Sequence, residues 1–192
     1  MPRVIDYSSV LDTLTRAGFE SLYHNSGAFG FARGVATQSV GWVGPADPTL
    51  RPDARSLTRQ VPAPHAENMA ALATRFRREH LPGPLWLMPK SHWAYELDYG
   101  NGDWLPAVLE QIAIAPATLA GRNDASAVEF DANDAAAFGR TLQELLTQLH
   151  GSDFALAWPS HPLTCTVHHH GQLWWTSTDP ALVVALTSLT PT

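Results

Sequence analysis

Apolar residues recur along this chain with two spacings, one typical of helices and one typical of strands. The alternation of these two spacings limits the fold more than any other feature of the sequence. A helix is predicted over residues 66–79, where apolar residues recur on one helix face: Met69, Leu72, Ala73 and Phe76. Pro82 ends this segment, and the short apolar run at 84–89 that follows is typical of a buried strand. Helices and strands that alternate in this way pack in layers around one core, which predicts an α+β fold.

The same two spacings place the remaining elements. Further helices are expected at 9–17, at 104–113, between Asp131 and Gly151, and from Asp179 onward. Strands are expected within 21–44 and at 92–100, 127–130, 154–159, 163–169 and 173–178. We therefore predict a mostly antiparallel, twisted sheet of about six to eight strands with helices packed on it.

The length of 192 residues suits a single domain with its own core, so one domain is predicted over 1–192. Residues 38–115 and 126–190 share an order of strand, helix, strand, strand and helix, which raises the hypothesis of two pseudo-repeated β-α-β-β-α halves. The competing interpretation is chance similarity, because proline after an apolar strand is common.

Charge and composition exclude several classes of protein. A formal net charge of −6 argues against general nucleic-acid binding, which needs a cationic surface to neutralise phosphates. No run approaches the ~20 apolar residues of a membrane span, and the first residues lack a secretory signal, so a cytoplasmic protein without membrane contact is expected. Cys165 is the single cysteine, which excludes an intrachain disulfide and a zinc site built from several cysteines.

Histidines and carboxylates supply a candidate metal site. The strand predicted from residue 163 leads into three histidines, of which His168 and His170 would project from one face and His169 from the other, and a tight hairpin is expected at His170-Gly171. His92 and Glu96 would share one face of the strand predicted at 92–100. If these strands are neighbours, nitrogen and oxygen ligands for a divalent transition metal would converge. The alternative is a solvated or hydrogen-bonded histidine cluster, because the chain has no HExxH or CxxC motif.

Arginines and tryptophans supply a candidate recognition surface. Arg51, Arg55 and Arg59 would stack along one side of a helix and could grip an anionic small molecule or protein. The alternative is a solvated helix face neutralised by the protein's own acids. Trp93 and Trp174 lie next to polar positions, where an exposed indole would bind a ligand and a buried one would be core.

These patterns favour a non-catalytic module that binds a ligand or a protein through an aromatic and arginine-rich surface. The alternative is a metal-dependent hydrolase in which Asp98 is the catalytic base beside a cation held by four ligands: His92, Glu96, His168 and His170. A nucleophilic mechanism is not expected, because the chain has no GxSxG motif and Cys165 lies within an apolar strand.

Overall fold

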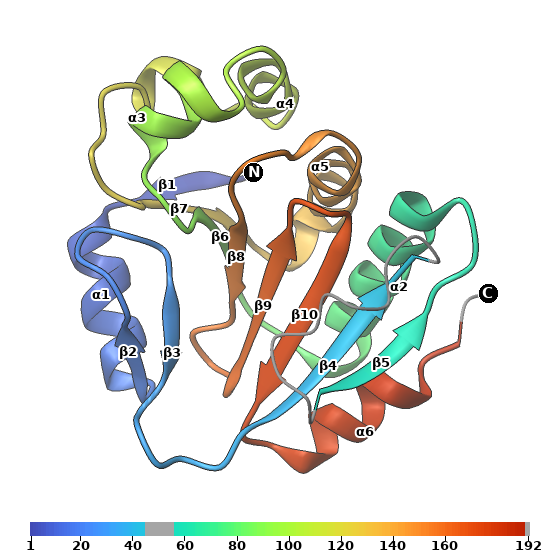
Figure 1. Cartoon of the computed structure of the whole chain (residues 1–192). Coiled ribbons are helices and arrows are strands. Elements are labelled where there is room, and N and C mark those ends of the chain that lie inside the picture. The colour runs from blue at the N-terminus through green and yellow to red at the C-terminus, as the bar shows by residue number, and fades with distance from the viewer. Residues whose placement is uncertain (45–55, 191–192) are drawn as a thin grey trace.

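The computed structural model describes residues 1–44 and 56–190, and its centre is a twisted sheet flanked by helices (Figure 1). Within these residues eight strands pair in the order β1-β7-β6-β8-β9-β10-β4-β5. In this order the strands are β1 (Arg3–Ile5), β7 (Ala127–Phe130), β6 (Leu85–Pro89), β8 (Phe154–Ala157), β9 (Leu163–His168), β10 (Gln172–Ser177), β4 (Gln38–Val43) and β5 (Leu57–Gln60). A separate hairpin pairs β2 (Phe19–Ser21) with β3 (Phe29–Phe31).

The sheet is mostly antiparallel, as the hydrophobic pattern predicted, and β4 and β5 form the parallel pair at one edge. The longer helices are α1 (Tyr7–Arg16), α2 (His65–His80), α4 (Leu105–Gln111), α5 (Ala135–Gln148) and α6 (Pro180–Ser188). Shorter helical segments are α3 (Trp93–Tyr95), η1 (Glu96–Gly100), η2 (Pro116–Thr118) and η3 (Ala132–Asp134). No helix in the described part of the chain is both long and apolar enough to cross a membrane.

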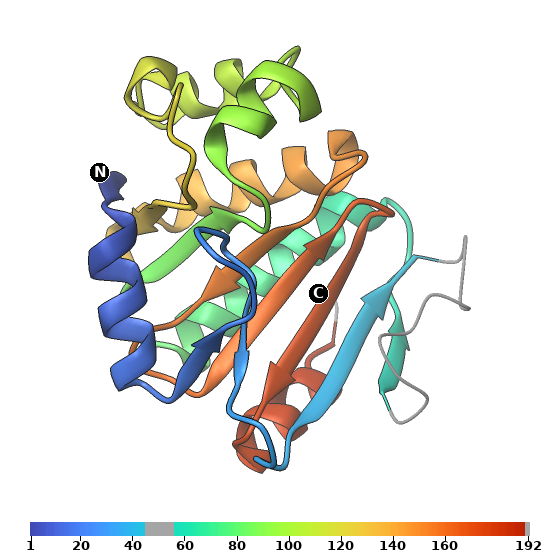
Figure 2. The same cartoon turned by 60° about the vertical axis from the view of Figure 1, so that its left-hand side comes forward.

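Both faces of the sheet are covered, but by different elements. Helices α2, α5 and α6 pack on one face, and α1 with the β2–β3 hairpin lies on the other (Figures 1 and 2). The larger core fills the face of α2, α5 and α6 and contains Trp42, Trp158 and Trp175 around the middle strands. A smaller core forms under α1, where Val10 and Leu14 pack near Trp86 and Met88 of β6. These two layers explain why β6 and β8 are buried along their whole length.

Residues 92–100 do not form the strand that their alternating pattern predicted. They form α3 and η1, which cross one end of the sheet together with α4 (Figure 1). The helix begins at His92, whose side-chain Nδ1 accepts a hydrogen bond from the Tyr95 amide at 3.2 Å. Trp93 is fully buried, and its indole donates to the Ser126 carbonyl oxygen, which fixes the first turn. The helix cap at His92 and the buried Trp93 therefore decide the conformation of this segment, and the alternating hydrophobic pattern does not.

The pseudo-repeat of 38–115 and 126–190 is not confirmed. After β6 the first half continues into α3, η1 and α4, whereas after β8 the second half continues into the strands β9 and β10. The strand that the repeat required at 92–100 is therefore replaced by helix. What the halves share is a helix that follows a strand and packs on the same face, α2 in one and α5 in the other.

Candidate metal centre

Three consecutive histidines lie at the turn between β9 and β10, at the end of the sheet that α3 and η1 cross. β9 ends at His168, and the chain turns through His169, His170 and Gly171 before β10 begins. The turn is closed by a hydrogen bond of 2.9 Å from the Gly171 amide to the His168 carbonyl oxygen. Gly171 has a φ of 66°, a conformation that glycine adopts without strain, so the position of the turn follows from the sequence.

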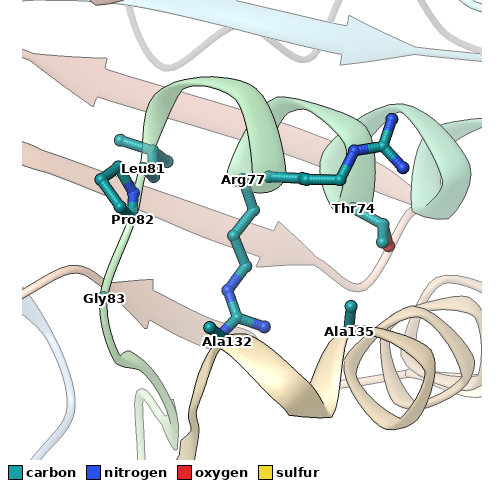
Figure 3. Close-up of a pocket in the computed structure, with 8 residues that line it drawn as sticks. Thr74, Arg77, Leu81, Pro82, Gly83, Ala132 and Ala135 are labelled. Atoms are coloured by element: carbon teal, nitrogen blue, oxygen red, sulfur yellow. The ribbon is translucent and has the colours of Figure 1, made fainter.

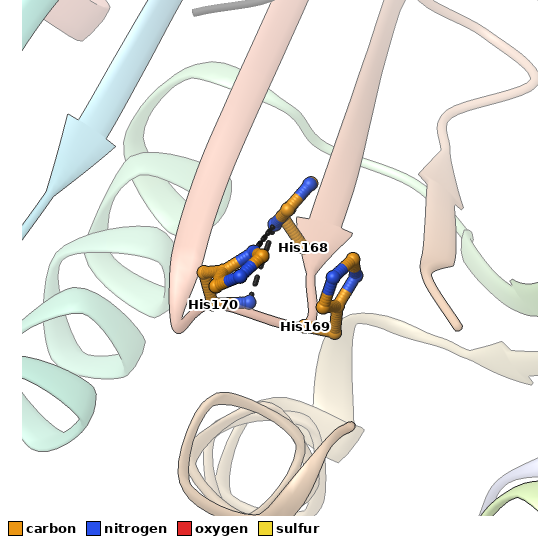
Figure 4. Close-up of side chains that lie close together, drawn as sticks. All are labelled: His168, His169 and His170. Carbon is orange, nitrogen blue, oxygen red and sulfur yellow. Dashed lines mark hydrogen bonds between the residues drawn. The ribbon is translucent and has the colours of Figure 1, made fainter. Parts of the chain in front are cut away.

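The turn brings all three imidazoles together (Figure 4). Their ring centroids are 4.2 to 4.9 Å apart, and one ligand nitrogen from each ring lies within 4.8 Å of the other two. The strand pattern predicted that His169 would point away from His168 and His170. It does not, because the strand ends at His168 and the alternation of faces stops in the turn.

Two of the imidazoles face each other through the same ring atom. The Nδ1 atoms of His168 and His170 are 3.2 Å apart, and the backbone amide of His170 also donates to His168 Nδ1 at 3.2 Å. Zinc binds imidazole nitrogen at ~2.0–2.1 Å, so two nitrogens around a tetrahedral ion lie roughly 3.4 Å apart. The observed separation is close to that of two ligands of one ion, and it is also the length of a hydrogen bond between the two rings.

Asp153 orients the third imidazole. Its Oδ1 lies 2.9 Å from His169 Nδ1 and accepts a hydrogen bond of 3.1 Å from the His169 backbone amide. With Nδ1 bound to a carboxylate, His169 presents Nε2 as its free ring nitrogen. Histidines that bind metals usually donate their second N–H to a carboxylate or carbonyl oxygen, which fixes the ring and raises its basicity. Asp153 is in the position for this role.

The surroundings keep one ring neutral at physiological pH. Burial lowers the pKa of His168, the nearby Asp153 carboxylate raises it, and the other two histidines with Lys90 lower it further. Because a metal binds the neutral imidazole, a lowered pKa reduces competition from protons. Lys90 acts in the opposite direction on a bound cation, although its Nζ lies 4.0 Å from an Asp153 carboxylate oxygen that offsets its charge.

Glu96 was predicted as a metal ligand, but its carboxylate is already fully used. The side chain is completely buried. Its oxygens accept hydrogen bonds from the Ser152 hydroxyl at 2.7 and 2.8 Å, from the side-chain amide of Asn101 at 2.6 Å, and from the Ser91 hydroxyl. These contacts join η1 to the loop before β8. Because α3 and η1 replace the predicted strand, Glu96 became an internal anchor and not a sheet-face ligand.

His92 and Asp98 also depart from the predicted site. The Nδ1 atom of His92 caps α3 and so faces its own helix. Asp98 is exposed on η1, in a shallow depression that His150 also lines, and no described contact joins it to His168 or His170. The predicted set of four ligands is therefore divided: His168 and His170 come together, and His92 and Glu96 serve the local fold.

The predicted arginine stripe is not a continuous helix face. Arg51 and Arg55 lie outside the described residues, and Arg59 lies in β5, where it is paired in register with Trp42 of β4. The Arg59 side chain is half-buried, and its Nη1 lies 3.5 Å from the Leu186 carbonyl oxygen. Burial lowers the pKa of Arg59. Arg59 therefore belongs to a strand at the edge of the sheet, although its spacing in the sequence predicted a helix.

Neither candidate tryptophan is exposed. Trp93 is 0% exposed and Trp174 is 6% exposed. Trp174 is not part of the larger core that contains Trp175, but its ring lies on Gly41, where a Cβ would come within 2.3 Å of it. Its indole N–H donates to the Gln172 side-chain oxygen at 2.9 Å. Glycine on the neighbouring strand therefore makes room for the ring and hides it.

His169 and Asp153 were not predicted as parts of one site. A signal for His169 was available, because the Gly171 that predicts the hairpin also predicts that strand alternation fails beside it. Asp153 carries no local signal, since it reaches His169 from the loop before β8, a strand whose neighbour is β9.

Comparisons of the chain with protein-family models, with curated proteins and with solved structures found no match.

Proposed function

We propose that this protein is a metal-binding protein that holds one divalent transition-metal ion at His168, His169 and His170. The proposal narrows the binding module suggested by the sequence to a specific ligand. The observation that carries it is the convergence of three imidazoles at one turn, with the two Nδ1 atoms of His168 and His170 3.2 Å apart.

The chemistry of the donors selects the ion. Three neutral imidazoles suit Zn²⁺, Cu²⁺ or Ni²⁺, whereas Mg²⁺ and Ca²⁺ prefer oxygen ligands. The proposed ligands are Nδ1 of His168, Nδ1 of His170 and Nε2 of His169, whose ring Asp153 orients. To bind the ion, His168 Nδ1 has to give up the hydrogen bond that it accepts from the His170 amide. The Nε2 atom of His169 has to move closer to the other two nitrogens, which rotation of half-exposed rings at a turn allows.

Three protein ligands leave one tetrahedral position for water or for a ligand atom from a partner. A hydrolase would need a base beside that position, and Asp98 has no described contact with the histidines. We therefore propose metal binding as the function and treat hydrolysis as the alternative that an activity screen of the loaded protein would reveal.

Calorimetric titration of the full chain with Zn²⁺, after treatment with a chelator, tests the proposal. We expect one ion per chain, and we expect His168→Ala and His170→Ala each to weaken binding at least about tenfold. The matched control is His150→Ala, which removes an exposed histidine from a neighbouring turn and should leave binding unchanged. Unchanged stoichiometry and affinity after replacement of all three clustered histidines would contradict the proposal.

A further inference from the structure

A second site lies at the opposite end of α5 from the histidine turn, which is near Leu146, in a pocket between α2 and the start of α5 (Figure 3). The pocket has a volume of about 220 Å³ and is lined mainly by small and aliphatic residues, with one buried cation: Thr74, Leu81, Pro82, Ala132, Ala135 and Arg77. This volume is below the ~300–1,000 Å³ of pockets that hold drug-sized ligands, so it suits a molecule of only a few carbon atoms.

Arg77 is the unusual residue in this pocket. It is 4% exposed, and its side chain extends from α2 toward Ala132 at the start of the next helix (Figure 3). Its Nη2 donates to the carbonyl oxygens of Phe130 at 2.8 Å and Asp131 at 2.5 Å. Its Nη1 is buried and has no hydrogen-bond partner among the described residues. A buried donor without a partner costs free energy. Because Nη1 is closed to solvent here, a ligand oxygen recovers this cost only after a small rotation of the guanidinium brings Nη1 to the pocket.

The protein's own carboxylates do not neutralise this guanidinium directly. Among the described residues no carboxylate oxygen lies within ion-pair distance of Arg77. The nearest acids are Asp131 and Asp134, and both cap the helical segment η3: Asp131 accepts from the Asn133 amide and Asp134 from the Asp131 amide. Burial lowers the pKa of Arg77, whereas the charges of Asp134 and Asp131 raise it, so these acids partly balance the guanidinium without an ion pair. The guanidinium carbon also lies 5.6 Å from the centre of the Phe138 ring.

The pocket lies beside the start of a helix, whose positive end is partly offset by the capping carboxylates of Asp131 and Asp134. η3 runs directly into α5, which has 14 residues, and the N-terminal end of a helix carries a partial positive charge. Ala132 and Ala135, from η3 and the first turn of α5, form one wall of the pocket. Arg78 lies at the rim and is mostly exposed, so it can attract an anion from solution.

We propose that this pocket binds a small aliphatic monocarboxylate, with its carboxylate toward Arg77 and its chain against Leu81, Pro82 and Ala135. The aliphatic walls favour a short hydrocarbon tail over a bare inorganic ion, because removing that tail from water is favourable. The single buried guanidinium favours one negative charge over two. The site is separate from the histidine cluster, and the inference does not depend on a bound metal.

Titration of the full chain, followed by nuclear magnetic resonance of its amide groups, tests this site with butanoate as the probe. We expect saturable shifts at Arg77, Ala132 and Ala135. Butanamide, which has the same shape without the charge, and inorganic phosphate, which has charge without the tail, should each bind at least about tenfold more weakly. Equal binding of phosphate would overturn the assignment of a monocarboxylate, and equal binding of butanamide would overturn the role of Arg77.

Two variants separate binding from folding. Arg77→Met should abolish butanoate binding, but it also removes hydrogen bonds to the Phe130 and Asp131 carbonyl oxygens and can weaken the fold. Ala135→Leu keeps Arg77 and fills the pocket from α5, so it should abolish binding in a folded protein. The matched control is Ala136→Leu, at an exposed position of the same helix, which should bind normally. Normal binding by folded Ala135→Leu would overturn the proposal.

Discussion

The carboxylate of Glu96 and the imidazoles of His168–His170 lie near the same end of the sheet, and the sequence suggested that they bind one metal together. The structure gives them opposite environments. Glu96 is fully buried, and hydroxyl and amide donors surround its oxygens. The histidines lie on a half-exposed turn and stack mainly on one another.

The difference follows from the supply of donors and acceptors. A carboxylate accepts hydrogen bonds only, and Ser91, Asn101 and Ser152 are donors that match it, so the group is complete without a ligand. Neutral imidazoles each carry one donor and one acceptor, and stacked rings cannot pair all of these atoms with one another. The Glu96 cluster, in which every acceptor has a donor, therefore has a structural role. The histidine cluster keeps ring nitrogens that can still accept, which is what a cation requires.

Replacing Glu96 tests the structural side of this comparison and should have the largest effect. Glu96→Ala removes the acceptors of three buried or half-buried donors, and we expect a loss of about 3–4 kcal/mol in the free energy of unfolding. Denaturant unfolding measures this loss, and Asp98→Ala on the same helical segment is the control that should not change stability. A stable Glu96→Ala protein with impaired zinc binding would reverse the comparison.

Replacing Asp153 tests the histidine cluster, the other half of this comparison. Asp153→Asn keeps the size of the side chain but weakens its hold on His169, and we expect zinc affinity to fall about 10–100-fold. Calorimetry with zinc measures the affinity, and thermal unfolding of the metal-free variant should show little change. If stability falls and affinity does not, Asp153 holds the loop before β8 and does not serve the metal.

Acid should reverse metal binding. Zinc binds neutral imidazole, and burial holds the pKa of His168 below the ordinary value of about 6.5, so this ring is neutral at pH 7. Affinity should be nearly constant from pH 8 to 7 and fall as pH decreases through the histidine range, by about tenfold between pH 7 and 6. Titrations at several pH values measure it. A flat profile down to pH 5 would exclude histidine ligands.

Replacing Lys90 should have the smallest effect. Its ammonium repels a cation at the histidines, although Asp153 partly neutralises it. Lys90→Gln should therefore raise zinc affinity about two- to threefold at low ionic strength, and the gain should shrink as added salt screens the repulsion. A decrease in affinity would indicate that Lys90 acts mainly by positioning Asp153.

Local sequence patterns correctly predicted the elements whose tertiary contacts favour the same conformation. The helix at 66–79 and the hairpin at Gly171 appear where predicted, because a strong apolar stripe and a glycine with positive φ are sufficient local signals. The segment 92–100 shows the limit of such signals. Its alternating residues satisfied a strand pattern, but the segment is helical, with His92 as its cap and the buried Trp93 bound to the Ser126 carbonyl oxygen.

By itself, the sequence predicted a mostly antiparallel sheet with packed helices and brought His168 and His170 together as candidate metal ligands. Only the tertiary structure decided which polar groups remain open, because that depends on partners distant along the chain. Ser152 completes Glu96, Asp153 orients His169, and the Phe130 carbonyl holds one side of the Arg77 guanidinium while leaving the other unpaired. Hydrogen bonding is short-ranged and directional, so only the folded arrangement shows which donors and acceptors meet.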